Sequence, residues 1–205
     1  MIAFYGATAI FLPWFKHLPY IVSSQPHNLT TLFIMKIFFK RLTLTALIIL
    51  GIGFLIPQNL KMPVVGAGSH SYNHETFWYE GWGSSIVHKG VDIFARKGTR
   101  INSATMGLVL ATGELGKGGK YVLILGPKWR VHYYAHLNEI TTSPLSFVTQ
   151  NTQIGTVGNT GNAKSTPAHL HYSIVTKVPY PWRIDDAPLG WQKMFYLNPI
   201  DYLEE

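Results

Sequence analysis

An uncharged, apolar run divides the chain into two parts of different character. The run LTLTALIILGIGFLI extends from Leu42 to Ile56, and three basic residues come shortly before it: Lys36, Lys40 and Arg41. Such a run is typical of an export signal or a membrane anchor, and its length lies between a signal-peptide core and a full span. The basic flank predicts a cytoplasmic N-terminal side, so everything after Leu60 should lie outside the cytoplasmic membrane. We therefore assign residues 35–60 to a signal peptide or a membrane anchor.

The surroundings of this run leave two questions with competing answers. The nearest small-residue cleavage site, Val65-Gly66-Ala67, lies far from the apolar run, which favours an uncleaved anchor. Upstream, residues 1–34 contain apolar patches interrupted by prolines, without helical or strand periodicity. This extension is either a second membrane span or an untranslated stretch, because MKIFFKR and the apolar run form a well-formed export signal that begins at Met35.

Charge and cysteine content exclude several classes of function. The net charge is +7, but residues 1–60 hold four basic residues and no acid, so the remainder carries only 13 bases against 10 acids. No clustered basic stripe is present, and we expect no nucleic-acid partner. Because the chain has no cysteine, it has neither disulfides nor thiolate ligands. Any bound metal must take nitrogen and oxygen ligands, as hydrolytic zinc commonly does.

After Gly66 the sequence changes to short runs rich in β-branched and aromatic residues, separated by Gly, Pro and Asn. Six such runs predict strands: Val91–Phe94, Gly107–Ala111, Tyr121–Leu125, Arg130–Ala135, Gln153–Val157 and Ala168–Val175. No run longer than about ten residues has a helical period, so we predict a mainly β domain built on an antiparallel sheet. The aromatic tail from Pro179 to Glu205 is expected to fold back on this sheet.

Three short patterns contain side chains that can bind a metal or move protons. They are His88-Lys89-Gly90-Val91-Asp92, Tyr134-Ala135-His136-Leu137 and His169-Leu170-His171. The last pair lies two residues apart in a strand-like run, so both imidazoles should leave the same face of the sheet. His136 ends another strand-like run and, by the same alternation, should share a face with Tyr134 and His132. Gly90 and its β-branched neighbours predict a turn entering a strand between His88 and Asp92.

These residues match the needs of a hydrolytic zinc site. Such a site requires three protein ligands, a bound water whose pKa falls to roughly 7, and a neighbouring group that handles protons. Any one of the histidines alone would be unremarkable on a protein surface or in a core. Their joint occurrence with Asp92 makes a zinc centre the better hypothesis.

The order of four blocks identifies a family that the chain resembles. HKGVDIFARKGT, YYAHL, IGTVGNTGNA and PAHLHYSI together resemble the lysostaphin-like zinc endopeptidases, the M23 or LytM-type domain, over roughly residues 85–176. The resemblance implies zinc ligation by His88, Asp92 and His171, with His136 and His169 as catalytic histidines. It also implies a folded antiparallel sheet with a groove, of the duplicated-hybrid type, within a peptidase domain that we assign to residues 67–205.

Two features depart from the family pattern. Where many members carry Ser-x-Phe-Gly-x-Arg ahead of the first ligand, this chain has EGWGSSIV. Some latent relatives cover the zinc with an upstream residue, and three candidates precede the domain blocks here: His70, Asn73 and His74.

The resemblance implies zinc-dependent hydrolysis of peptide cross-links in bacterial peptidoglycan, with the peptide stems as substrate. Zn2+ would polarise the peptide carbonyl, and His136 and His169 would handle protons or stabilise the oxyanion. We expect the domain to work in the periplasm or cell wall, either membrane-anchored or exported. The alternative is a non-catalytic LytM-type regulator that activates a separate cell-wall amidase, although such relatives usually lose ligands.

Overall fold

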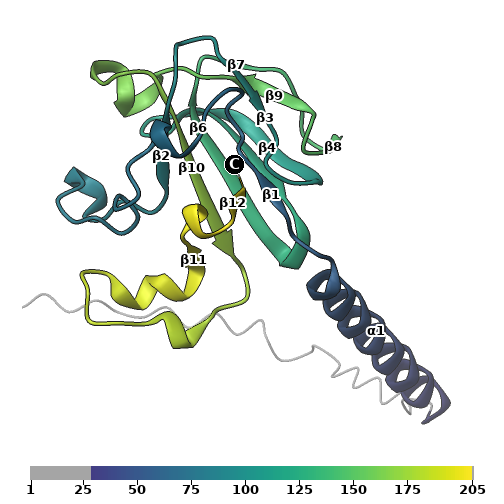
Figure 1. Cartoon of the computed structure of the whole chain (residues 1–205). Helices are drawn as coiled ribbons and strands as arrows, with labels where there is room; N and C mark the ends of the chain where they lie inside the picture. The colour runs from purple at the N-terminus through teal and green to yellow at the C-terminus, as the bar shows by residue number, and fades with distance from the viewer. Residues whose placement is uncertain (1–28, 205) are drawn as a thin grey trace, which may run out of the picture. The chain divides into compact units, whose positions relative to one another are not determined.

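The computed structural model describes residues 29–204, which comprise one long helix and a β-rich body (Figure 1). The prolines at positions 13, 19 and 26, on which the two interpretations of residues 1–34 depend, lie outside the described residues.

Helix α1 extends from Leu29 to Leu55, about 40 Å at 1.5 Å per residue. Among the described residues it is the single helix whose length and composition would allow it to cross a membrane. It begins ahead of Met35 and so includes the last residues of the stretch 1–34, for which no helical period was expected. Residues 35–55 alone would still reach about 30 Å, so either start site leaves a helix of membrane length.

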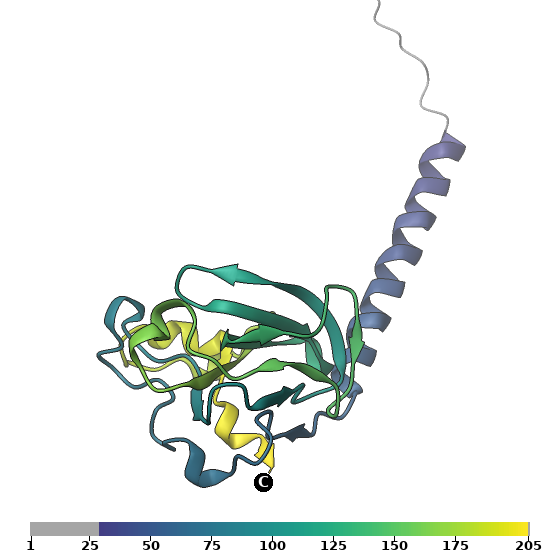
Figure 2. The same ribbon diagram turned by 90° about the horizontal axis from the view of Figure 1, so that it is seen from above.

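A seven-stranded antiparallel sheet forms the centre of the body. Its path is β11-β10-β6-β5-β4-β8, and β2 also pairs with β10. The strands are β2 (Val91–Phe94), β4 (Gly107–Leu115), β5 (Gly119–Leu125), β6 (Arg130–Leu137), β8 (Phe147–Val148), β10 (His169–Thr176) and β11 (Tyr196–Leu197). Viewed from above, the long strands curve around the core (Figure 2). The predicted strands in this sheet and the mainly antiparallel β class are confirmed, with shifts at strand ends.

Smaller elements complete the body. A three-stranded sheet has the order β3-β9-β7, and the remaining two strands, β1 and β12, pair in parallel. Their bounds are β1 (Leu60–Lys61), β3 (Arg100–Asn102), β7 (Glu139–Ile140), β9 (Gln153–Thr156) and β12 (Leu203–Glu204). Short 3-10 helices cover 69–71, 83–85, 127–129, 161–165, 181–183, 190–195 and 199–201. The two-residue strands were not predicted, because a run of two residues is too short to have a measurable hydrophobic period.

The core lies against one face of the central sheet. Tyr134 on β6 and Tyr172 on β10 are fully buried, with ring centroids 5.0 Å apart. Leu60 and Val64 also belong to this core, although they precede residue 67, where we placed the start of the domain. In the aromatic tail, β11 pairs with β10 and buries Leu197, so the expectation that the tail folds back on the sheet is confirmed.

Candidate metal centre and groove

The central strand β10 brings the candidate ligands together. β10 pairs with β2 so that His171 lies opposite Asp92, and the turn before β2 supplies His88. Gly90 makes this turn possible, because a Cβ there would lie 2.5 Å from both the Ser173 hydroxyl and a β10 carbonyl. His88 and His171, which are 83 positions apart in sequence, are thereby held in contact by the backbone of one sheet.

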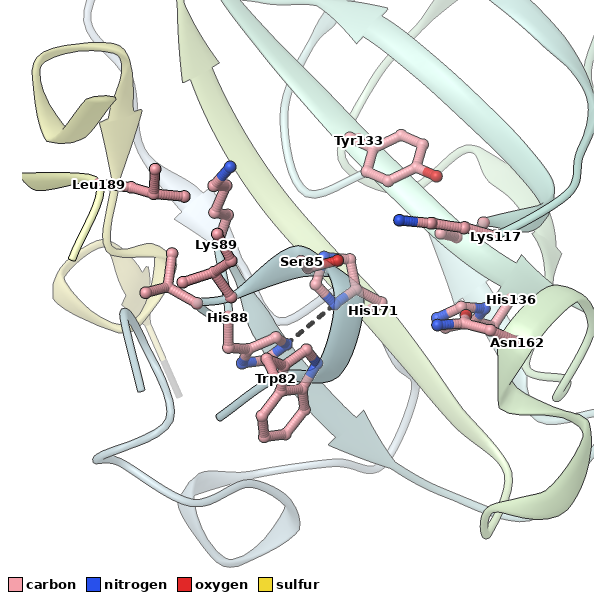
Figure 3. A pocket seen from close by; sticks show the side chains of 14 residues that line it. Trp82, Ser85, His88, Lys89, Lys117, Tyr133, His136, Asn162, His171 and Leu189 are labelled. Carbon is pink, nitrogen blue, oxygen red and sulfur yellow. Dashed lines mark hydrogen bonds between the residues drawn. The ribbon is translucent and has the colours of Figure 1, made fainter. Parts of the chain in front are cut away.

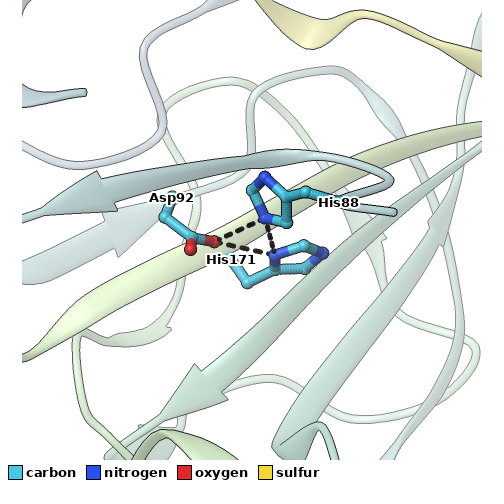
Figure 4. A group of neighbouring side chains, drawn as sticks. All are labelled: His88, Asp92 and His171. Carbon is cyan, nitrogen blue, oxygen red and sulfur yellow. Dashed lines mark hydrogen bonds and ion pairs between the residues drawn. The ribbon is translucent and has the colours of Figure 1, made fainter. Parts of the chain in front are cut away.

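Three potential ligand atoms meet in a small triangle (Figure 4). His88 Nε2 lies 3.1 Å from Asp92 Oδ1 and 3.0 Å from His171 Nδ1, and the latter two atoms lie 2.8 Å apart. Tetrahedral zinc with bonds of about 2.0–2.2 Å would separate its ligand atoms by about 3.3 Å. The triangle therefore needs to expand by only a few tenths of an ångström to fit the ion.

Hydrogen bonds on the outer side of each ring determine which nitrogen faces the triangle. His88 Nδ1 lies 3.1 Å from the Thr76 carbonyl oxygen, which can only accept, so Nδ1 carries the proton. The Ser173 hydroxyl donates to the Lys89 carbonyl oxygen and accepts from His171 Nε2 at 2.9 Å. The two nitrogens that face Asp92 are consequently lone-pair acceptors. Three acceptors within 3.1 Å of one another repel unless a cation lies between them, and this donor set suits zinc.

Two further imidazoles border the triangle. His136 Nδ1 and His169 Nδ1 donate to the carbonyl oxygens of Thr160 and Pro167, at 2.9 and 2.8 Å. Each ring is thereby left with Nε2 as its acceptor. The ring centroids of His136 and His169 are 5.0 Å apart, and His169 Nε2 lies 3.8 Å from Asp92 Oδ2. The structure thus brings together all five residues that the sequence singled out.

A β-bulge gives His136 its position. Between β5 and β6 the register shifts so that one residue of β5, Tyr121, opposes two of β6, Ala135 and His136, and His136 has φ of +63°. Simple alternation predicted that His136 shares a face with Tyr134 and His132, and this prediction was wrong. Tyr134 lies in the core and His132 is fully buried against Tyr172, whereas His136 lines the groove. The left-handed residue interrupts the alternation and turns the imidazole to the other face.

Burial and local charge set the protonation states. Burial opposes ionisation of Asp92. When the metal-free rings of His171 and His88 take up a second proton, on the nitrogen that faces Asp92, their hydrogen bonds and positive charge outweigh burial and hold the Asp92 pKa well below its usual range. Burial, then the positive potential of His171 and His169, lowers the pKa of His136 to about 4. At neutral pH, Asp92 is therefore a carboxylate and His136 is an uncharged base.

The groove above these residues has two parts that share lining residues, a cavity of about 420 Å³ and a second of about 330 Å³. Both are lined by Trp82, His136, Asn162 and His171, and Figure 3 shows the larger of the two. The Trp82 ring stacks on His88 at a centroid distance of 4.2 Å and an angle of 27°. Trp82 belongs to the EGWGSSIV stretch that departs from the family pattern, and nothing in the sequence pattern predicted its contact with His88. The Ser173 contact was foreseeable, since Ser173 follows His171 by two on the same strand.

The upstream residues considered as a cover lie outside the groove lining in the described part of the chain. His74 Nε2 contacts the Ser69 carbonyl at 3.2 Å, and Asn73 accepts a hydrogen bond from the Glu75 amide. The contribution of this segment is the Thr76 carbonyl, which orients His88 from behind.

Comparison with known proteins agrees with this geometry. Residues 86–180 match the model of Peptidase family M23. This segment is a family M23 peptidase domain. The match runs from the turn before His88 to the end of β10 and beyond, and so includes every residue of the triangle.

Two curated relatives carry names of cell-wall enzymes. An L-Ala--D-Glu endopeptidase of Bacillus subtilis is 30% identical over 137 residues, 61% of this chain and 42% of the relative. The peptidoglycan DD-endopeptidase ShyA of Vibrio cholerae is 31% identical over 90 residues, 44% of this chain and 20% of the relative. The chain thus spans less than half the length of either relative.

Solved structures support the fold. The catalytic domain of lysostaphin from Staphylococcus simulans aligns with 65% of this chain and 92% of its own, at 20% identity and a TM-score of 0.52. A putative glycyl-glycine endopeptidase lytM from Ruminococcus gnavus aligns with 69% of this chain and 58% of its own, at 23% identity and a TM-score of 0.53. The M23 domain therefore has the lysostaphin-like fold expected from the sequence.

Proposed function

We propose that this chain is a zinc-dependent endopeptidase that hydrolyses peptide cross-links of bacterial peptidoglycan. The observation that carries the proposal is the convergence of three lone-pair atoms, from His88, Asp92 and His171, beside an open groove. The names of the two curated relatives support peptidoglycan as the substrate.

In this proposal each residue has a separate task. His88 Nε2, Asp92 Oδ1 and His171 Nδ1 hold the zinc, which when bound would polarise the peptide carbonyl and lower the pKa of a water molecule. His136 and His169 offer Nε2 as acceptors, so either can take a proton from the attacking water and return it to the leaving amine. The carbonyls of Thr160 and Pro167 keep these rings in the tautomer that this task requires.

We further propose that α1 anchors the domain outside the cytoplasmic membrane. The basic residues ahead of the apolar run favour a cytoplasmic N-terminal side. Cleavage after Val65-Gly66-Ala67 would detach β1 and Val64 from the core, which would expose buried apolar surface. An uncleaved anchor keeps the folded domain whole.

A test uses the full-length chain, purified in detergent and incubated with isolated peptidoglycan. We expect uncross-linked fragments with new amino termini, detected by mass spectrometry, and loss of the reaction with a chelator until zinc is restored. His136→Ala should retain zinc and lose activity about a hundredfold or more. The control is His70→Ala, which removes an exposed imidazole outside the groove.

The regulator alternative makes the opposite prediction. A regulator would release no fragment by itself, would stimulate a separate amidase, and would tolerate both His136→Ala and His169→Ala. That result would refute the proposed catalytic function.

A further inference from the structure

The larger part of the groove has an unbalanced charge. Its lining contains two lysines, Lys89 and Lys117, and no Asp or Glu among the described residues. Asp92 lines the smaller part, where its carboxylate contacts the His88 and His171 imidazoles. The surface that a substrate would meet beside the metal triangle is therefore positive.

Both lysines come from backbone that the fold holds firmly. Lys89 follows His88 directly, and its carbonyl oxygen accepts from the Ser173 hydroxyl at 2.8 Å. Lys117 lies in the turn between β4 and β5, and its carbonyl oxygen accepts from the Asn162 amide at 3.0 Å. Gly161 has φ of +70°, and a Cβ at this position would lie 2.3 Å from the Lys117 carbonyl oxygen. The absence of a side chain therefore lets the two segments approach closely.

The two ammonium groups border the groove from different elements (Figure 3). Lys89 Nζ lies 5.5 Å from the centroid of the Tyr196 ring. Within residues 29–204, no ion pair joins Lys89 or Lys117 to a carboxylate. Lys89 is only partly exposed, and a cation that has lost part of its hydration gains more from a carboxylate partner than a fully solvated one does.

We propose that Lys89 and Lys117 form a subsite for a free carboxylate of the substrate, next to the bond that is cut. The preferred substrate is then an acidic peptide stem, and a neutral oligoglycine bridge is a poor one. This inference rests on the proposed peptidase function and assigns its substrate class.

The test uses two cross-linked stem peptides that are identical except that the carboxylates are free in one and amidated in the other. The full-length zinc-loaded protein should have a KM about tenfold lower for the free-carboxylate peptide, with kcat within about twofold. The double variant Lys89→Gln, Lys117→Gln should lose this difference, and Lys89→Arg, Lys117→Arg should restore it. Lys97→Gln, at an exposed lysine outside the groove, should behave as wild type.

A binding measurement separates failure of this inference from failure of the proposed function. Both peptides are titrated calorimetrically into His136→Ala, which should bind them without turnover. If the wild type cleaves the two peptides with equal KM and His136→Ala binds them equally, the carboxylate subsite is refuted while the peptidase function stands. If neither peptide is cleaved yet the free carboxylate is bound about tenfold more tightly, the subsite stands and the peptidase function falls.

Discussion

Removing the Ser173 hydroxyl should weaken zinc binding without disturbing the ligands themselves. Ser173 is 3% exposed, and its hydroxyl accepts from His171 Nε2 and donates to the Lys89 carbonyl. In Ser173→Ala both bonds are lost, and His171 is free to carry its proton on Nδ1, the atom proposed to bind zinc. Hydrogen bonds that orient a metal-bound imidazole contribute about 10–100-fold in affinity, which corresponds to about 1.4–2.7 kcal/mol.

The zinc dissociation constant is measured by competition with a chromophoric chelator, and unfolding by denaturant titration of the metal-free protein. The matched control is Thr176→Val on the same strand. Thr176 is 1% exposed, and its hydroxyl makes two bonds with the Val178 backbone. Each variant should lose about 1–3 kcal/mol of unfolding free energy, but only Ser173→Ala should lose zinc affinity. Equal zinc affinity in Ser173→Ala and wild type would refute the tautomer argument.

Three further predictions test other contacts. His132 is fully buried, and burial lowers its pKa from 6.5 to about 3. Between these two pH values the unfolded state binds more protons than the folded state, so the free energy of unfolding should fall by about 1.4 kcal/mol for each pH unit below 6.5. His132→Gln should flatten the pH dependence of the denaturant midpoint. Gly90→Ala should lower the free energy of unfolding by about 1–3 kcal/mol and weaken zinc binding, because the alanine Cβ would lie 2.5 Å from the Ser173 hydroxyl. A variant with wild-type stability and zinc affinity would contradict this contact. Trp82→Ala should weaken zinc binding about fivefold by removing the ring stacked on His88, whereas Trp182→Ala, at an exposed ring outside the groove, should not.

Local patterns in the sequence predicted most of the central sheet. Most strands that form it are short runs rich in β-branched and aromatic residues between clear turn signals, and β2 begins and ends where such a run does. Strands of two residues, such as β1 and β12, depend on long-range pairing and have no local signal. For the same reason, no local pattern indicated that Leu60 lies in the core.

The candidate site was predictable in its residue types but not in its geometry. His169 and His171 project to one site because regular alternation holds along β10. His136 reaches it only through a bulge, and a left-handed non-glycine residue has no pattern that identifies it in a single sequence. Trp82 was missed because a lone aromatic in a glycine-containing loop has many possible neighbours.

The parallel pairing of β1 with β12 limits how far the proposed enzyme can work from its anchor. Only residues 56–59 separate the end of α1 from β1, a span of at most about 14 Å, and Gln58 within it already contacts His132 at 2.9 Å. For a helix held in the bilayer, the tether has almost no slack. The groove would then sample a thin shell of wall next to the membrane, and strands farther out would be cut only as they pass through it.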